Sequence, residues 1–181
     1  FIWDDIAYVQ ITLNIISAEA AQADDMHALR ILFDLAFKST SPDEAINRLL
    51  AFAGEYINAS RSYIFESISE ITTSNTYEWC APGEEPAIDQ LQDLPKDEYS
   101  YDHIINNGVA VTDDIRNLSA EDREILEPQG IKSMALIPIF SSQGPLGYVG
   151  FDDCHNYRRW AQHEIQLLQS IADLIASLLI R

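Results

Sequence analysis

The stretch GIKSMALIPIFSSQGPLGYVGFDD, residues 130–153, contains two apolar segments separated by a short polar connection. SMALIPIF (133–140) and LGYVGFDD (146–153) have the length and apolar content of β-strands. The connection SSQGP (141–145) has the length and the Gly-Pro chemistry that favour a hairpin. We therefore predict two antiparallel strands over this stretch.

A second hairpin is predicted upstream, from SYIFESIS (62–69) and TSNTYEWCA (73–81), because the segments alternate or are rich in Thr and aromatics. The following residues, 82–108, contain three prolines and many acids, and we expect only a short helix near 101–107 there. VAVTDDI (109–115) is predicted as a short strand. Ser119 with Asp122 predicts the start of a brief helix.

Two longer helices are indicated. Ser41, Pro42 and Glu44 form a strong helix-start signal, because Ser can cap, Pro fits the first turn and Glu follows Ser by three residues. The last helix is expected over about 161–181. It carries two apolar stripes, Ile165, Leu168, Ala172, Ile175 and Leu179 on one face, and Leu167, Ile171, Leu174 and Leu178 on another. A helix packed only on its own sheet needs one stripe, so the second predicts a further partner.

The first 25 residues are predicted as a linker helix with a coiled-coil seam. Apolar residues recur there at alternating spacings of four and three, at Ile2, Ile6, Val9, Leu13, Ile16, Ala20 and Ala23. We expect this seam and the second stripe of the last helix to form a parallel homodimer interface, which contains Ile6, Val9, Leu13, Ile16, Leu167, Ile171, Leu174 and Leu178. The alternative is a helix that lies flat on its own domain. After Ala23 the register shifts, and Met26, Leu29, Phe33 and Ala36 are expected to pack on the globular body.

The element order predicts an α+β domain with helices gathered against one antiparallel sheet. Residues 130–153, followed by Trp160 and EIQLLQSIADLIASLL (164–179), together with ASRSYIFE (59–66), resemble a GAF domain. The resemblance covers about residues 26–181. With YEWC (77–80) and AIDQLQDLP (87–95), the chain is similar to GAF modules of bacterial signalling proteins, which often precede diguanylate cyclase or histidine kinase domains. It implies a PAS-related sheet with helices on one side and loops and short helices on the other. It also implies a non-catalytic sensory or regulatory module, with an effector domain in cis.

Composition excludes several partners. The formal charge of −18 disfavours nucleic acids and anionic membranes, because binding there depends on clustered cations. Cys80 and Cys154 show no pairing motif, and no apolar run has the length of a membrane span, so we expect a cytoplasmic domain. Because the chain starts at Phe1 and stops at Arg181 within an apolar helical pattern, we expect it to be a piece of a longer protein.

FDDCHNYRRW (151–160) places Asp152, Asp153, Cys154 and His155 side by side. Successive strand residues point to opposite faces, so we predict neither a metal site nor a thiol nucleophile. In bilin-binding relatives of the resembled family the attachment Cys-His pair lies in the helix before residue 130. Here that helix carries Glu121 and Asp122, so we expect no covalent bilin and no cofactor. The cyclic-nucleotide signature of the family is matched only in part, by Trp160 and one acid.

A small neutral or cationic metabolite, enclosed between the sheet and residues 82–108, remains a candidate ligand. Aromatics with a few polar groups are typical of such pockets. The residues expected to contact it are Trp79, Tyr99, Tyr101, His103 and Asp113. Alternatively, the aromatics fill the pocket themselves, and the domain is a ligand-free dimerisation or protein-interaction module. No catalytic constellation is visible, so an enzyme is not expected.

Overall fold

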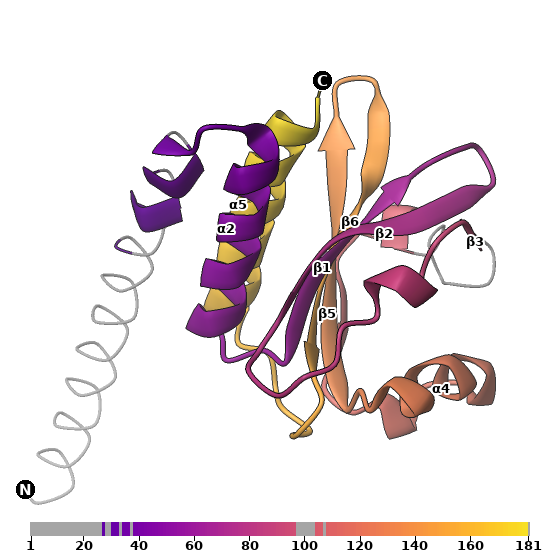
Figure 1. Ribbon diagram of the computed structural model, residues 1–181. Helices are drawn as coiled ribbons and strands as arrows, with labels where there is room; N and C mark the ends of the chain where they lie inside the picture. The colour runs from indigo at the N-terminus through magenta and orange to yellow at the C-terminus, as the bar shows by residue number, and fades with distance from the viewer. Residues whose placement is uncertain are drawn as a thin grey trace, which may run out of the picture.

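Six strands form one antiparallel sheet in the order β3-β2-β1-β6-β5-β4 (Figure 1). The computed structural model describes residues 27, 30–32, 34–36, 38–96, 104–106 and 108–180. The strands are β1 (Arg61–Ser67), β2 (Thr72–Cys80), β3 (Leu94–Pro95), β4 (Ala110–Thr112), β5 (Ser133–Ser141) and β6 (Gly144–Asp153). The predicted α+β fold is therefore confirmed.

Both predicted hairpins are present, and their long strands form the centre of the sheet. β5 and β6 are joined by only two residues, Ser142 and Gln143, so Gly144 and Pro145 belong to β6 and not to the turn. The register places Ile137 opposite Val149 and shifts after Ile139. β1 pairs with β2 on one side and with β6 on the other. This central position gives β1 neighbours from both hairpins.

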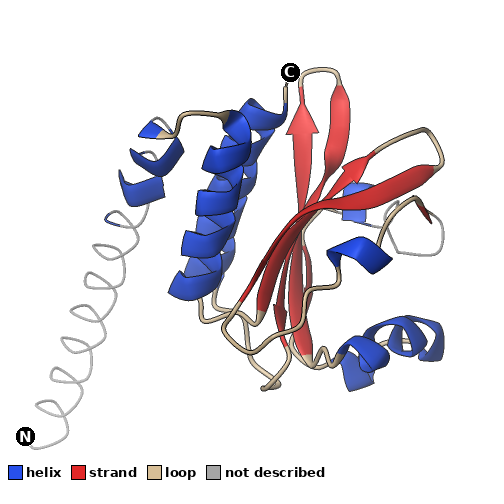
Figure 2. Cartoon of the chain, viewed as in Figure 1, coloured by secondary structure: helices blue, strands red, loops and turns tan. Residues whose placement is uncertain are grey.

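Helices α2 (Pro42–Tyr56) and α5 (Gln162–Leu179) lie side by side on one face of the sheet (Figure 2). The predicted cap is confirmed, because the Ser41 hydroxyl accepts from the Glu44 N–H at 3.1 Å. The carboxylate of Glu44 accepts in return from the N–H of Thr40, at 2.8 Å, one residue before the expected donor. α4 (Ala120–Leu126) starts as predicted, with Ser119 accepting from the Asp122 N–H. The 3₁₀ turns are η1 (Ile88–Gln90), η2 (Ile115–Asn117) and η3 (Glu127–Gln129).

The two faces of the sheet are buried in two separate hydrophobic clusters. Ile64, Val149 and Phe151 belong to the larger cluster, which also contains the apolar residues of α2 and α5. The smaller cluster on the opposite face contains Phe65, Ile104, Leu136 and Tyr148. α4 and η1 lie on that second side (Figure 1). Because side chains alternate along a strand, each central strand contributes to both clusters.

The second apolar stripe of α5 requires a correction. Leu167 is 3% exposed and Ile171 is fully buried, both within the large cluster, while Leu174 and Leu178 are partly buried against it. α5 contacts both β5 and α2, so two neighbours in the same chain cover a wide arc of the helix. The inference that this stripe needs a further partner was therefore wrong for Leu167 and Ile171.

The predicted linker helix, including Ile6, Val9, Leu13 and Ile16, lies outside the described residues, as do Met26, Leu29 and Phe33. Residues 30–32, 34–36 and 38 are helical, and Leu32 and Ala36 pack with the large cluster. The domain boundary at 25/26 stays a prediction. Among the helices that the structure describes, none combines the length and the hydrophobicity needed to span a lipid bilayer.

Candidate functional site

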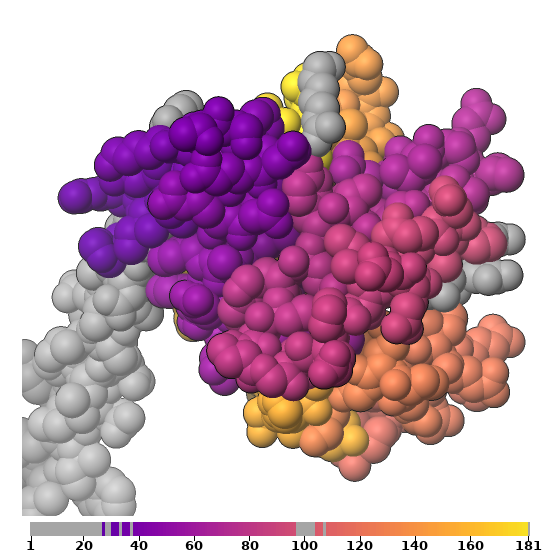
Figure 3. Space-filling model, in the orientation of Figure 1, coloured from indigo at the N-terminus to yellow at the C-terminus, as the bar shows by residue number. Residues whose placement is uncertain are grey.

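A cavity of about 460 Å³ lies between the second face of the sheet and α4. β1, β5 and β6 form its floor, and the segments around η1, β4 and α4 form its walls. In the space-filling view, the segment after β2 and the α4 region lie next to each other on the surface (Figure 3). The described residues that line the cavity are Arg61, Tyr63, Phe65, Glu78, Ala87, Leu91, Ile104, Ala110, Val111, Thr112, Leu118, Asp122, Ile125, Leu126, Gln129, Ile131, Met134, Leu136, Tyr148 and Asp152. This size suits an organic molecule of one or two rings.

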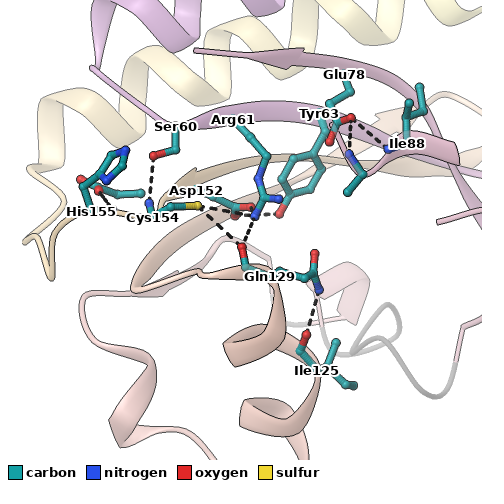
Figure 4. A network of polar contacts seen from close by, with 12 residues as sticks. Ser60, Arg61, Tyr63, Glu78, Ile88, Ile125, Gln129, Asp152, Cys154 and His155 are labelled. Atoms are coloured by element: carbon teal, nitrogen blue, oxygen red, sulfur yellow. Dashed lines mark hydrogen bonds and ion pairs between the residues drawn. The ribbon is translucent and has the colours of Figure 1, made fainter. Parts of the chain in front are cut away.

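One end of the floor is a buried polar group centred on Asp152, which is 1% exposed. Its Oδ2 accepts from Nη2 of Arg61 at 3.2 Å, and its Oδ1 accepts from the hydroxyl of Tyr63 at 2.9 Å (Figure 4). The Arg61 side chain is only 6% exposed, so the two charges form a buried ion pair. Burial removes the hydration of both ions. The attraction between them offsets this loss only when their geometry is good and their other polar atoms are hydrogen-bonded.

Strand register positions this group. Arg61 on β1 lies directly opposite Asp152 on β6, and Tyr63 lies opposite Gly150. The Tyr63 ring lies against Gly150 so closely that a Cβ there would be 2.2 Å from the ring. Glycine at 150 therefore lets the ring lie on β6 and extend its hydroxyl to Asp152.

Four further contacts, two of Arg61 and two of Glu78, extend this polar group. Nη2 of Arg61 also donates to the carbonyl of Gln129, at 3.2 Å, and lies 3.6 Å from Sγ of Cys154. Oε2 of Glu78, on β2, accepts from the N–H groups of Ala87 and Ile88, both at 2.9 Å. Glu78 thereby holds the start of η1 close to β2, at one side of the cavity.

Burial controls the electrostatics of the site. It raises the pKa of Asp152 to about 6, although Arg61 and Tyr63 both lower it. Burial also raises the pKa of Tyr63, and the Asp152 carboxylate adds to that shift. For Arg61, burial is the largest single effect and lowers the pKa, but Asp152, Cys154, Tyr63 and Glu78 together outweigh it, so the pKa is raised. Burial raises the pKa of Cys154 too, which keeps its thiol protonated at neutral pH.

The polar residues of FDDCHNYRRW diverge, as the strand periodicity predicts. Asp152 faces Arg61, whereas Oδ1 of Asp153 accepts from the N–H groups of His155 and Asn156. The imidazole of His155 is 2.6 Å from Glu84 and largely exposed. Within the described ranges, no three His, Cys, Asp or Glu side chains gather as a metal site would require.

Of the predicted ligand residues, the structure describes Trp79 and Asp113, and neither lines the cavity. Trp79 lies on the helix face, where its ring packs on Gly54 of α2, so it is separated from the cavity by the sheet. Asp113 accepts from the N–H of Trp160 at 3.2 Å and does not line the cavity. Tyr99, Tyr101 and His103 lie outside the described residues. The assignment of Trp79 and Asp113 to this pocket is therefore corrected.

The polar residues of the cavity floor were missed, namely Arg61, Tyr63, Glu78 and Asp152. A signal was present, because Arg61 precedes four uncharged strand residues and Asp152 follows the apolar run LGYVGF. A buried position for either ion calls for a partner of opposite charge. The sequence separation of 91 residues hides that the two are partners.

Comparisons with known proteins agree on the fold. A model of the GAF domain family matches residues 41–179. The methanogenesis regulatory histidine kinase FilI of Methanothrix harundinacea (strain 6Ac) is 35% identical over 175 residues, which are 93% of this chain and 19% of that protein. The chain thus spans about a fifth of the length of that relative.

Two similar solved structures bind bilins. One is a far-red absorbing dark state with bound biliverdin IXa, with a TM-score of 0.74, 20% identity and coverage of 83% of this chain and 96% of the other. The second is the phycocyanobilin-bound GAF domain from a cyanobacterial phytochrome, with a TM-score of 0.73, 17% identity and coverage of 84% and 92%. At these identities the likeness concerns the fold alone.

Proposed function

This chain belongs to the GAF domain family, and on that premise we propose that it is a sensory module whose cavity binds a small molecule. Binding changes the packing of the helices on the other face of the sheet, and these relay the change to an effector domain. GAF domains are generally regulatory and not catalytic, and we propose the same for this chain. The observation that carries the proposal is a cavity with a mostly apolar lining and a fixed polar group at one end.

A chain of contacts joins the cavity floor to both helices. The N–H of Ser60 donates to the carbonyl of Asp152 at 2.7 Å, and the Ser60 hydroxyl accepts from the N–H of Cys154 at 2.9 Å. Further along the same segment, Nη1 of Arg158 donates to the carbonyl of Ile57, at the end of α2, at 2.6 Å. A movement of Asp152 would thus shift the segment that contacts the end of α2.

Arg158 also reaches the start of α5. Its Nη2 pairs with Oε1 of Glu164, whose Oε2 accepts from the N–H of Ala161 at 2.8 Å. One guanidinium therefore contacts the last turn of α2 and the first turn of α5. A ligand can shift this arrangement only as far as it binds one packing more tightly than another.

The similarity to a histidine kinase supports an effector domain in cis. We propose that this effector is of the histidine kinase or diguanylate cyclase type, and that the module works in the cytoplasm as a homodimer. The dimer would be held by the heptad seam of the first 25 residues. Leu174 and Leu178, which remain partly exposed on α5, could extend that interface.

Ligand binding is tested by filling the cavity. Met134→Trp places a large ring beside Asp152, whereas Ile71→Trp adds the same ring at a position that is 75% exposed. In a thermal-shift screen of metabolites, a hit at about 100 times its Kd should stabilise the unmodified chain by about 3 kcal/mol. The hit should lose its effect with Met134→Trp and keep it with Ile71→Trp. If no compound distinguishes these variants, the ligand-free interaction module is the better function.

The relay is tested by hydrogen exchange on the unmodified chain with and without a hit from that screen. Protection should appear at α4 and also at residues 154–161 and the last turn of α2. Protection confined to the cavity walls would contradict a relay.

Light scattering tests the dimer. Leu13→Glu should halve the mass at micromolar concentration, whereas Ile71→Glu should not change it. A monomeric unmodified chain would contradict the dimer.

A further inference from the structure

The charges at the cavity wall are unbalanced. Among the described lining residues there are three carboxyl groups, Glu78, Asp122 and Asp152, and one guanidinium, Arg61. The charge of Arg61 is paired with Asp152, because its Nη2 donates both to Asp152 and to the carbonyl of Gln129. An anionic ligand would therefore meet a guanidinium whose charge is already paired, and it would lie near three carboxylates.

The hydrogen-bonding capacity of these carboxylates also favours a cationic ligand over an anionic one. A carboxylate oxygen can accept about two hydrogen bonds, and each oxygen of Asp152 accepts one from the described residues. Oε2 of Glu78 accepts two backbone N–H groups, whereas its Oε1 accepts none from any residue that the structure describes. Nε of Arg61 is a buried donor without a partner among the described residues. The carboxylates of Asp152 and Glu78 therefore have acceptor capacity left for a ligand group that is rich in hydrogen-bond donors.

Most of the other residues that line the cavity are apolar. Phe65 and Tyr148 stack with their ring centroids 5.2 Å apart, and Leu136 and Ile104 complete this cluster. A ring system that lies on these side chains would be removed from water, while its charged end reaches the acidic wall.

From this arrangement, and on the basis of the proposed sensory function, we propose that the cavity binds a small organic cation of the aryl-alkylamine or amidine class. The apolar body lies on Phe65, Tyr148 and Leu136, and the positive group is held between Glu78 and Asp152. Asp152 acts as an internal counterion to Arg61 and thereby excludes carboxylate ligands.

The test uses three probes with the same ring and chain length: tryptamine, tryptophol and indole-3-propionate, which end in an ammonium, a hydroxyl and a carboxylate. Calorimetry and ligand-observed NMR at pH 7.5 should give tryptamine at least about tenfold tighter binding than indole-3-propionate, with tryptophol between them. Equal or tighter binding of the carboxylate, or binding of none of the three, would overturn the proposed ligand class. The sensory function itself would fail only if the cavity-filling screen also finds no compound.

Variants separate charge from shape. Glu78→Gln should weaken tryptamine about fivefold and leave tryptophol unchanged, whereas Glu55→Gln, on the exposed side of α2, should change neither. Asp152→Asn should release Arg61, so that indole-3-propionate binds more tightly and the preference for the cation is lost. An unchanged preference in both cavity variants would contradict the proposal. If Asp152→Asn does not fold, as judged by circular dichroism, the unmodified chain and Glu78→Gln still decide.

Discussion

The two faces of the sheet are formed by the same strands but are packed differently. On the helix face, Ile64, Val149 and Phe151 are at or near 0% exposure, and the helices fill the space above them. On the cavity face, the neighbouring residues Tyr63, Phe65 and Tyr148 surround a space of about 460 Å³ and a buried ion pair. The comparison indicates that stability comes mainly from one face, so that the other can keep a hollow and costly polar group.

The largest effect should come from removing a ring on the helix face. Phe151→Ala should lower the free energy of unfolding by about 4 kcal/mol, because the fully buried ring leaves a cavity that its neighbours cannot fill. Leu136→Ala, on the cavity face, should cost about half as much, since part of its surroundings is already empty. Urea denaturation measures both. Equal losses would mean that the two faces contribute alike.

Breaking the buried ion pair should have the next largest effect. Arg61→Met leaves Asp152 buried without its cation and should cost about 3 kcal/mol at pH 7.5. The double variant Arg61→Met/Asp152→Leu should recover most of this loss. Arg48→Met, which breaks an exposed pair with Glu44 on α2, should cost less than about 1 kcal/mol. A double variant no more stable than Arg61→Met alone would contradict this account.

The pH dependence of stability should differ between the chain and Asp152→Asn. Burial raises the pKa of Asp152 from 3.8 to about 6, so the folded state holds this proton more tightly than the unfolded state. The resulting stabilisation is fully present below about pH 4 and is lost as the pH rises through 6, a change of about 2–3 kcal/mol. Denaturation midpoints at pH 4.5 to 7.5 should show this change relative to Asp152→Asn. A constant difference would mean that Asp152 stays ionised throughout.

The smallest effect concerns Trp79 on the helix face. Gly54→Ala places a Cβ 2.2 Å from the Trp79 ring and should cost about 1 kcal/mol, although alanine favours a helix. With Trp79→Leu in the same chain, the alanine should become neutral or stabilising. Melting curves and tryptophan fluorescence report the change. If Gly54→Ala stabilises the otherwise unmodified chain, the ring does not lie against α2.

Local patterns were sufficient for most of the fold. The hairpin over residues 130–153 and the helix start at Ser41 were predictable, because apolar periodicity and capping residues act over a few neighbouring positions. The second stripe of α5 was misjudged for the opposite reason. Its periodicity reports how much of the helix is buried, and not whether α2 of the same chain or a second chain covers it.

The site was less accessible to sequence reasoning. Every residue of β2 is buried or half-buried, so the aromatic character of Trp79 does not tell which face it joins. The buried polar group depends on the pairing of β1 with β6, which brings together Arg61 and Asp152 across 91 positions. Such long-range pairs follow from register, and register becomes known only with the sheet.

The contact between Tyr63 and Gly150 limits how relatives of this chain can vary. Any side chain at position 150 would push the ring off β6 and take its hydroxyl away from Asp152. Positions 63 and 150 should therefore change together during evolution: glycine at 150 wherever 63 is aromatic, and a larger residue at 150 only where 63 is small. Homologues with that second combination should have lost the hydroxyl at the cavity floor and, with it, their preference among ligands.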